Sequence, residues 1–142
     1  MIEIKENERA AFSSILSAEA EIFSDAWSER ALISHMDGSS SRTLAAYLDG
    51  VFAGYLLGSL IPPEGEVYRI AVLPPYRGRG VGDALLSAML AETPVCFLEV
   101  RESNLFARAL YERHGFVQVG TRRGYYKEPK EDACVYRRER IV

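Results

Sequence analysis

The chain has 142 residues, 48% hydrophobic and 26% charged, which is typical of a globular protein rather than a disordered one. Lysine and arginine number 17 against 20 acidic residues, and the net charge of −3 argues against a non-specific nucleic-acid binder. No apolar run reaches the ~20 residues of a membrane span, and the first residues lack a secretory-signal pattern. We therefore expect one cytoplasmic domain over residues 1–142, without a membrane partner. Cys96 and Cys134 lie in apolar runs without metal-ligand spacing, so we expect buried free thiols and no metal site.

Helical and strand-like periodicities alternate along the chain. Helices are predicted for roughly residues 7–21, for a short segment capped by Ser28 and ended by Gly38, for Val81–Met89 and for Ser103–His114. Strands are predicted for Ile2–Lys5, Thr43–Leu48, Val51–Leu57, Val67–Leu73, Val95–Val100, Phe116–Gly120 and Ala133–Arg138. The residues between Gly120 and Ala133 are expected to form a long polar loop.

The predicted elements indicate a mixed sheet. Val95–Val100 is nearly continuous apolar sequence, as in a central strand that is buried on both faces. It follows a strand and a helix, and such a right-handed strand–helix–strand unit makes its two strands parallel. We expect an α/β (α+β) domain in which six to seven strands are flanked by about four helices around this parallel unit.

A glycine-rich segment, Arg77-Gly78-Arg79-Gly80-Val81-Gly82, lies between a predicted strand and a helix. Glycines at this point let backbone N–H groups approach an anion at the positive end of the helix, and Arg77 and Arg79 add cations. Asp83 replaces the third glycine of a dinucleotide fingerprint, and no Walker sequence follows. The segment therefore predicts phosphate binding, in preference to a simple turn with solvated arginines.

Glu99 interrupts an apolar strand near its C-terminal end, where open α/β sheets bind their ligands. It is a candidate general base, and pairing with Arg101 or with solvent is an equally weighted alternative. Asn104, Arg108 and Tyr111 fall at i, i+4 and i+7 on one helical stripe. Tyr111 is a candidate proton donor, although a tyrosine on an amphipathic helix is more often part of the core.

Several other charged residues carry little functional signal. His35 and His114 lie near helix ends without a partner in sequence, and we expect neither to be catalytic. Arg122-Arg123 and Arg137-Arg138 are expected to be solvated charges of a loop and an edge strand.

Taken together, these segments resemble the GNAT (Gcn5-related N-acetyltransferase) superfamily, and within it the RimI-like branch, which acetylates the N-terminal amine of a ribosomal protein. The glycine-rich segment is similar to the superfamily's Q/R-x-x-G-x-G/A loop for the pyrophosphate of acetyl-CoA. Leu98-Glu99-Val100-Arg101 with Ser103-Asn104 resembles the branch's L-E-V-R-x-S-N, and Ala109-Leu110-Tyr111-Glu112 with Gly115-Phe116 resembles its A-L-Y-E-x-x-G-F. The stretch from Gly82 to Glu99 is shorter than in the family.

The resemblance implies acetyl-CoA as co-substrate and a role for each matched residue. Backbone groups of Ile70, Ala71 and Val72 would bind the acetyl carbonyl and pantetheine, the pyrophosphate would lie on Arg77, Gly78, Arg79, Gly80, Val81 and Gly82, and Asn104 would hydrogen-bond the cofactor. Glu99 would be the general base, and Tyr111 would protonate the departing thiolate. Trp27, Tyr125 and Tyr126 are candidates for the walls of a peptide groove.

The basicity of the acceptor favours an N-terminal amine. At pH 7 an α-amino group of pKa ≈ 7.7–8.0 reaches its neutral form for about 1 kcal/mol, whereas a lysine needs roughly 4.6 kcal/mol. We therefore expect acetylation of a protein N-terminus, and the resemblance implies a ribosomal protein with N-terminal alanine. The alternatives are acetylation of a small amine, such as a polyamine or an amino sugar, and a non-catalytic acyl-CoA-binding regulatory module.

Overall fold

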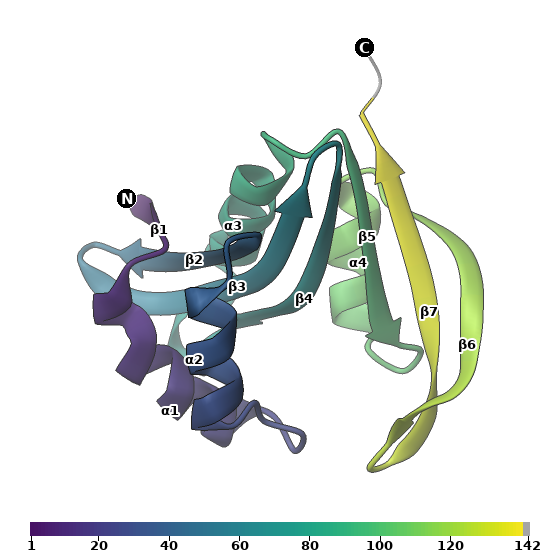
Figure 1. Ribbon diagram of the computed structural model, residues 1–142, viewed down its shortest axis with the longest axis horizontal. Helices are drawn as coiled ribbons and strands as arrows, with labels where there is room; N and C mark the ends of the chain where they lie inside the picture. Colours follow the sequence, from purple (N-terminus) through teal and green to yellow (C-terminus); the bar gives the residue numbers. More distant parts are fainter. Residues whose placement is uncertain (141–142) are drawn as a thin grey trace.

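The computed structural model describes residues 1–140, in which four α-helices flank a seven-stranded sheet of order β1-β2-β3-β4-β5-β7-β6 (Figure 1). The strands are β1 (Ile2–Glu6), β2 (Ser41–Leu48), β3 (Val51–Ile61), β4 (Glu64–Val72), β5 (Val95–Arg101), β6 (Val117–Lys127) and β7 (Lys130–Glu139). The helices are α1 (Phe12–Ile22), α2 (Glu29–Asp37), α3 (Val81–Leu90) and α4 (Leu105–Arg113), with 3₁₀ turns at Arg9–Ala11 and Pro74–Tyr76. The predicted mixed sheet and its parallel β4–α3–β5 unit are confirmed. No helix in this range has the length and apolar character to cross a membrane.

The segment after Gly120 is an extended strand and not the predicted polar loop. A long polar loop was expected there, but β6 continues to Lys127 and forms an antiparallel hairpin with β7. Nearly every residue of β6 is exposed, because β6 is one of the two edge strands and packs against β7 rather than under a helix. Such a strand lacks the apolar alternation that marks a half-buried strand, so the pattern resembled that of a loop. By contrast, the cap of α2 is as predicted, since the Ser28 hydroxyl accepts a hydrogen bond from the Ala31 N–H at 3.1 Å.

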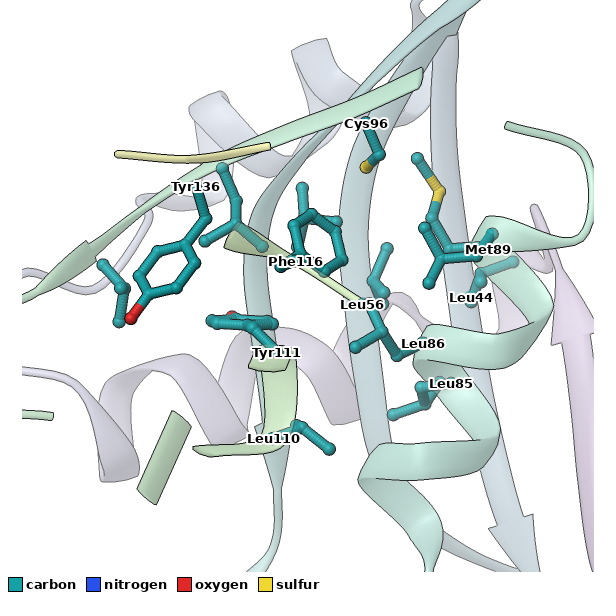
Figure 2. Close-up of a cluster of buried hydrophobic side chains, with 14 of the residues drawn as sticks. Leu44, Leu56, Leu85, Leu86, Met89, Cys96, Leu110, Tyr111, Phe116 and Tyr136 are labelled. Carbon is teal, nitrogen blue, oxygen red and sulfur yellow. The ribbon is translucent and has the colours of Figure 1, made fainter. Parts of the chain in front are cut away.

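Two hydrophobic cores cover opposite faces of the sheet. Helices α3 and α4 pack on one face in the larger core, which Figure 2 shows around Tyr111, Phe116 and Met89. Helices α1 and α2 pack on the other face, against Tyr55 and Leu57 of β3. Both predicted thiols, Cys96 and Cys134, are buried and free. Strand β3 is therefore covered on both sides. Strand β5 contributes only Cys96, Leu98 and Val100 to a core, and its other face is half-buried, so the prediction that β5 is buried on both faces is wrong.

Strands β4 and β5 are paired over only part of their length. Their parallel register runs from Glu64 opposite Val95 to Val67 opposite Leu98. On the other side of β4, the register with β3 shifts so that Tyr68 is an extra residue between two paired positions. Such a bulge increases the local twist of a strand. Beyond Val67 and Leu98 the two strands have no register with each other, and a gap opens within the sheet.

Gly58 of β3 lies opposite this bulge and has no room for a side chain. A Cβ atom there would lie 2.5 Å from the Glu66 carbonyl oxygen and 3.3 Å from Cε of Met89. Because the first contact is with backbone, the β4 strand itself would have to move. We expect Gly58→Ala to lower the free energy of unfolding by about 1–3 kcal/mol, measured by urea denaturation. Gly120→Ala is the control, since a Cβ at Gly120 meets no atom within 4 Å, and an equal loss in the two variants would contradict the argument.

Candidate active site

The gap between β4 and β5 holds a cleft of about 230 Å³. Its lining residues come from the end of α1 and the following loop, from both strands, from α4 and from β6. They are Ile22, Phe23, Ser24, Asp25, Tyr68, Arg69, Ile70, Glu99, Val100, Arg101, Asn104, Ala107, Tyr111 and Tyr126. Five residues that the sequence analysis proposed for the site meet in this cleft, namely Ile70, Glu99, Asn104, Tyr111 and Tyr126.

Glu99 lies on the face of β5 opposite the α3–α4 core, because Leu98 and Val100 on either side of it point into that core. Its carboxylate does not pair with Arg101. Instead Oε1 lies 3.2 Å from Nε of Arg122, which corrects the prediction that Arg122 is only a solvated charge. Oε2 is buried and has no hydrogen-bond partner among the described residues. This oxygen is therefore available to a ligand in the cleft.

Two further titratable groups lie close enough to sense the Glu99 charge. Hydrogen bonding to the Glu99 carboxylate, followed by burial, raises the pKa of Tyr125 above its ordinary value. On β4, burial and then the repulsion from Glu99 raise the pKa of Glu66, while the Arg122 guanidinium acts in the opposite direction. The Arg122 guanidinium thus acts on both carboxylates, but its ion pair is with Glu99.

Tyr111 reaches the cleft from α4, on the opposite side of the sheet from Glu99. Its side chain is 5% exposed and packs edge-on to Phe116, so the expected core role is met as well (Figure 2). Burial raises the pKa of Tyr111 well above its ordinary value, which keeps the hydroxyl protonated. No described residue forms a hydrogen bond with this hydroxyl group, so the proton is free for a ligand.

Asn104 begins α4, and its Oδ1 accepts a hydrogen bond from the Ala107 N–H at 3.1 Å. The side chain therefore fixes the start of the helix while it lines the cleft, and the amide NH₂ remains available as a donor. Arg108 on the same stripe is used structurally, since its guanidinium donates to the Tyr136 hydroxyl and to the Glu102 carbonyl.

The glycine-rich loop lies outside the lining of the cleft, at the N-terminus of α3. Gly78 and Gly80 have φ angles of +78° and +84°, in the left-handed region that only glycine adopts without strain. Gly80 is the N-cap of α3, so the free N–H groups of the first helical turn begin directly after it. A Cβ at Gly82 would lie 3.4 Å from Leu110 of α4, and Arg77 donates to the Val72 carbonyl at 2.9 Å. The loop is thereby held between β4 and α4, the two elements that bound the cleft.

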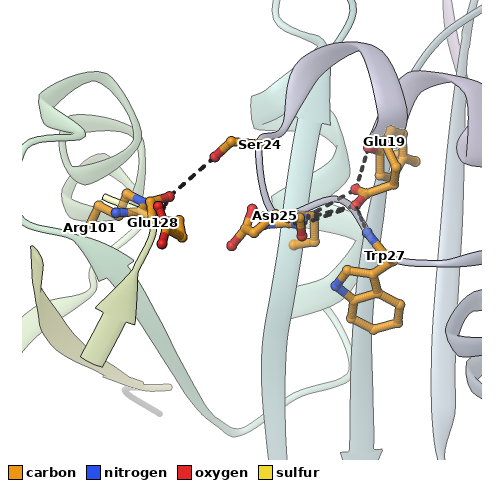
Figure 3. Close-up of polar contacts among 8 residues, drawn as sticks. Glu19, Ser24, Asp25, Trp27, Arg101 and Glu128 are labelled. Carbon is orange, nitrogen blue, oxygen red and sulfur yellow. Dashed lines mark hydrogen bonds and ion pairs between the residues drawn. The ribbon is translucent and has the colours of Figure 1, made fainter. Parts of the chain in front are cut away.

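A buried carboxylate fixes one wall of the cleft, formed by Phe23–Asp25. Glu19 of α1 is fully buried and accepts hydrogen bonds from the Tyr55 hydroxyl at 2.6 Å and the Trp27 N–H at 2.9 Å (Figure 3). It also pairs with the Arg69 guanidinium at 3.1 Å. The network therefore joins helix α1, strand β3 and the bulged part of β4.

Arg69 extends this network to the wall itself. Its guanidinium lies 3.8 Å from the centre of the Phe23 ring and donates to the Asp25 carbonyl oxygen at 2.9 Å. Trp27, predicted to line a peptide groove, lies behind the wall and packs against His35 and Tyr68. Tyr68, not Trp27, is the aromatic residue of this group that reaches the cleft.

Arg101 of β5 fixes the opposite wall, formed by Tyr126–Pro129, in a similar way. It donates to the main-chain oxygens of Glu128 and Pro129 at 3.2 and 2.9 Å and lies 4.2 Å from the centre of the Tyr126 ring. A 3.4 Å hydrogen bond from the Ser24 hydroxyl to the Glu128 carbonyl joins the two walls (Figure 3). Tyr126 thus lines the cleft as predicted, whereas Tyr125 is outside the lining and lies beside Glu99.

A family model described as "Acetyltransferase (GNAT) family" matches residues 10–116. The chain belongs to the GNAT family. It is 39% identical over 129 residues to N-alpha-acetyltransferase RimI of Mycobacterium tuberculosis. The matched region covers 85% of this chain and 82% of that protein. It is 34% identical over 116 residues to the ribosomal protein bS18-alanine N-acetyltransferase of Escherichia coli K12, with 77% and 78% covered. A crystal structure of the ribosomal-protein-S18-alanine N-acetyltransferase from Escherichia coli superposes with a TM-score of 0.90 at 29% identity, covering 100% of this chain and 96% of that one.

The two arginines that fix the walls of this GNAT cleft were missed in the sequence. A usable signal exists for Glu19, the buried partner of Arg69, because Glu19 follows Ile15 by four residues and so lies on the apolar face of α1. A charge in that position is rarely buried without an opposite charge to pair with it. Arg69, inside the apolar strand of β4, is the corresponding signal on the sheet. Arg101 and Arg122 give no such signal, because their partners depend on the hairpin that was expected to be a loop.

We expect Glu19→Gln to destabilise the fold by on the order of 3 kcal/mol, since it leaves the half-buried Arg69 without its most buried partner. The same change should raise amide hydrogen exchange in residues 23–27, which the network holds. Urea denaturation and exchange mass spectrometry measure the two effects. The control is Glu21→Gln, an exposed position on the same helix, and similar losses in both variants would show that the buried pair has no special role.

Proposed function

We propose that this protein transfers the acetyl group of acetyl-CoA to the N-terminal α-amine of a protein, specifically a ribosomal protein with N-terminal alanine. The observation that carries the proposal is the cleft between the separated ends of β4 and β5, which has Glu99 on one face of the sheet and Tyr111 on the other. Membership of the GNAT family supports acetyl transfer, and the names of the RimI relatives support the class of acceptor.

The α3–α4 side of the cleft is suited to acetyl-CoA. The pyrophosphate would bind at the start of α3, where Gly78 and Gly80 expose N–H groups and the helix dipole favours an anion. Arg77 and Arg79 supply cations at the same place. Beyond Val67 the backbone of β4 has no strand partner on the β5 side, so the stretch Ile70-Ala71-Val72 is available to the pantetheine and acetyl carbonyl.

The opposite side is suited to a peptide amine. Tyr68, Asp25 and Tyr126 line the cleft around Glu99, and the carboxylate at its base attracts an ammonium group. An acceptor that enters here would meet the thioester within the sheet, because the cleft reaches both faces between β4 and β5. Trp27 supports this wall from behind through Tyr68 and is not a direct contact in this proposal.

The proposed chemistry needs two proton transfers at opposite ends of the cleft. Glu99 accepts a proton from the acceptor ammonium, which frees the nitrogen lone pair for attack on the thioester carbon. A C–N bond forms, and the C–S bond breaks as Tyr111 gives its hydroxyl proton to the sulfur of the departing CoA. The second proton of the nitrogen leaves to solvent as the amide forms, and Tyr111 regains a proton from solvent before the next turnover. A tyrosine with a raised pKa holds this proton until the thiolate develops, and the Tyr111 hydroxyl makes no competing hydrogen bond with the described residues.

The activity is tested by release of CoA from acetyl-CoA with three acceptors: a peptide that begins with alanine, the same peptide blocked at its N-terminus, and a free polyamine. Turnover of the unblocked peptide alone, with the acetyl group located on the α-nitrogen by mass spectrometry, is the expected result. Preferential turnover of the polyamine would support the small-amine alternative. Binding of acetyl-CoA without turnover of any amine would indicate a regulatory module.

Glu99→Gln isolates proton acceptance, because the amide keeps the shape of the side chain but cannot take a proton. At pH 7 and saturating peptide we expect kcat to fall by about 10²–10⁴-fold. The deficit relative to wild type should shrink at pH 9, where solvent supplies the neutral amine. Glu102→Gln, an exposed position after the same strand, is the control. Equal kcat values for Glu99→Gln and wild type over pH 6–9 would exclude Glu99 as the base.

Tyr111→Phe removes the proposed proton donor and keeps the ring in the core. We expect kcat to fall by about 10²-fold or more, with the KM for acetyl-CoA within roughly two-fold of wild type. Steady-state kinetics with acetyl-CoA as the varied substrate separate the two quantities. An effect confined to the acetyl-CoA KM would instead assign Tyr111 a packing role beside the cofactor.

A further inference from the structure

Arg122 is the cation that pairs with the proposed base before any acceptor is present. It extends from the edge strand β6, is 58% exposed, and lies with Nε 3.2 Å from Oε1 of Glu99, whose side chain is 21% exposed. The pairing register of β6 with β7 is irregular between Arg122 and Tyr126. A long, exposed side chain on an irregular edge strand can leave such a pair at little cost, because exposed ion pairs are weak.

The charges around this ion pair do not balance. Glu66 on β4 is the neighbour of Phe97 in the parallel register, one strand away from Glu99, and its pKa responds to Glu99 and Arg122 alike. The titratable and charged groups around Glu99 are Glu66 and Tyr68 on β4, Asp25 and Arg69 at the first wall, Arg101 on β5, Tyr111 on α4, and Arg122, Tyr125 and Tyr126 on β6. Arg69 and Arg101 are held by their own carboxylates, so Arg122 alone is paired with Glu99.

We propose that Arg122 occupies the place of the acceptor ammonium on Glu99 and moves aside, towards Glu66, when the acceptor enters. This inference rests on the proposed function. The incoming ammonium replaces one cation by another, so Glu99 is never left as an unpaired charge in the cleft. After Glu99 has taken the proton it is neutral, and Arg122 remains balanced by Glu66. The exchange also explains how a carboxylate that is paired with a guanidinium in the free enzyme can serve as a base in the complex.

The exchange predicts a specific kinetic effect of Arg122→Gln, measured with an alanine-terminated peptide at saturating acetyl-CoA between pH 6 and 9. The KM for the peptide should fall about two- to five-fold, because the ammonium no longer competes with a guanidinium, and kcat at the plateau should stay unchanged. Arg122→Lys should restore the wild-type values, and the KM for acetyl-CoA should not change.

Arg123→Gln is the matched control, since Arg123 is exposed on the same strand and has no ion pair among the described residues. A higher peptide KM in Arg122→Gln would mean that Arg122 binds the acceptor, and a lower kcat would mean that it acts in the reaction. Kinetics equal to those of Arg123→Gln would mean that the ion pair is incidental. Each of these results overturns the inference while wild-type turnover of the peptide upholds the proposed function. Absence of wild-type turnover with every peptide would overturn both.

Discussion

The separation of β4 from β5 is the constraint on which the rest of the site depends. The two strands pair from Glu64 to Val67, and beyond that point the bulge at Tyr68 turns β4 away from its neighbour. If β4 and β5 were paired along their whole length, the sheet would separate Glu99 from Tyr111, which lie on opposite faces. Because the sheet is open at this point, groups from its two faces can act on one pair of ligands. Gly58 also contributes to this separated arrangement, because a larger residue there would collide with the β4 backbone.

Where β4 and β5 are separated, the loops at the edge of the cleft have no strand pairing to hold them. The side chains of two arginines hold them instead. Arg69 and Arg101 stand near the ends of the separating strands, and each hydrogen-bonds main-chain oxygens of one wall and stacks on an aromatic ring of that wall. Arginine is suited to both tasks, because its planar guanidinium has several donors in its edge and an apolar face. The fully buried Glu19 adds an anchor on the β4 side. On the β5 side the partner of Arg101 is Glu131, which is only partly buried.

The sequence predicts the parts of the molecule that depend on local patterns. Seven strands, four helices, the Ser28 cap and the parallel unit all follow from periodicity and turn residues, and the motif around Glu99 places that residue in the cleft. The sequence does not predict Arg122 as the ion-pair partner of Glu99. Only Phe116–Gly120 of this region is predicted as a strand, and Arg122 lies in the exposed continuation of β6, where neither the strand nor its register leaves a hydrophobic signal. The two wall arginines are hidden for a related reason, since their partners are main-chain oxygens and aromatic rings far away in the chain.

The hydrogen bond from Ser24 to the Glu128 carbonyl is the sole polar contact between the two walls in residues 1–140, and it is long and exposed. Each wall is otherwise attached to its own strand. Substitutions in residues 23–25 can therefore reshape one side of the entrance while the other side and the carboxylate between them stay as they are. Under the proposed function, a change in acceptor preference can be confined to one wall, while the residues at the floor of the cleft stay the same.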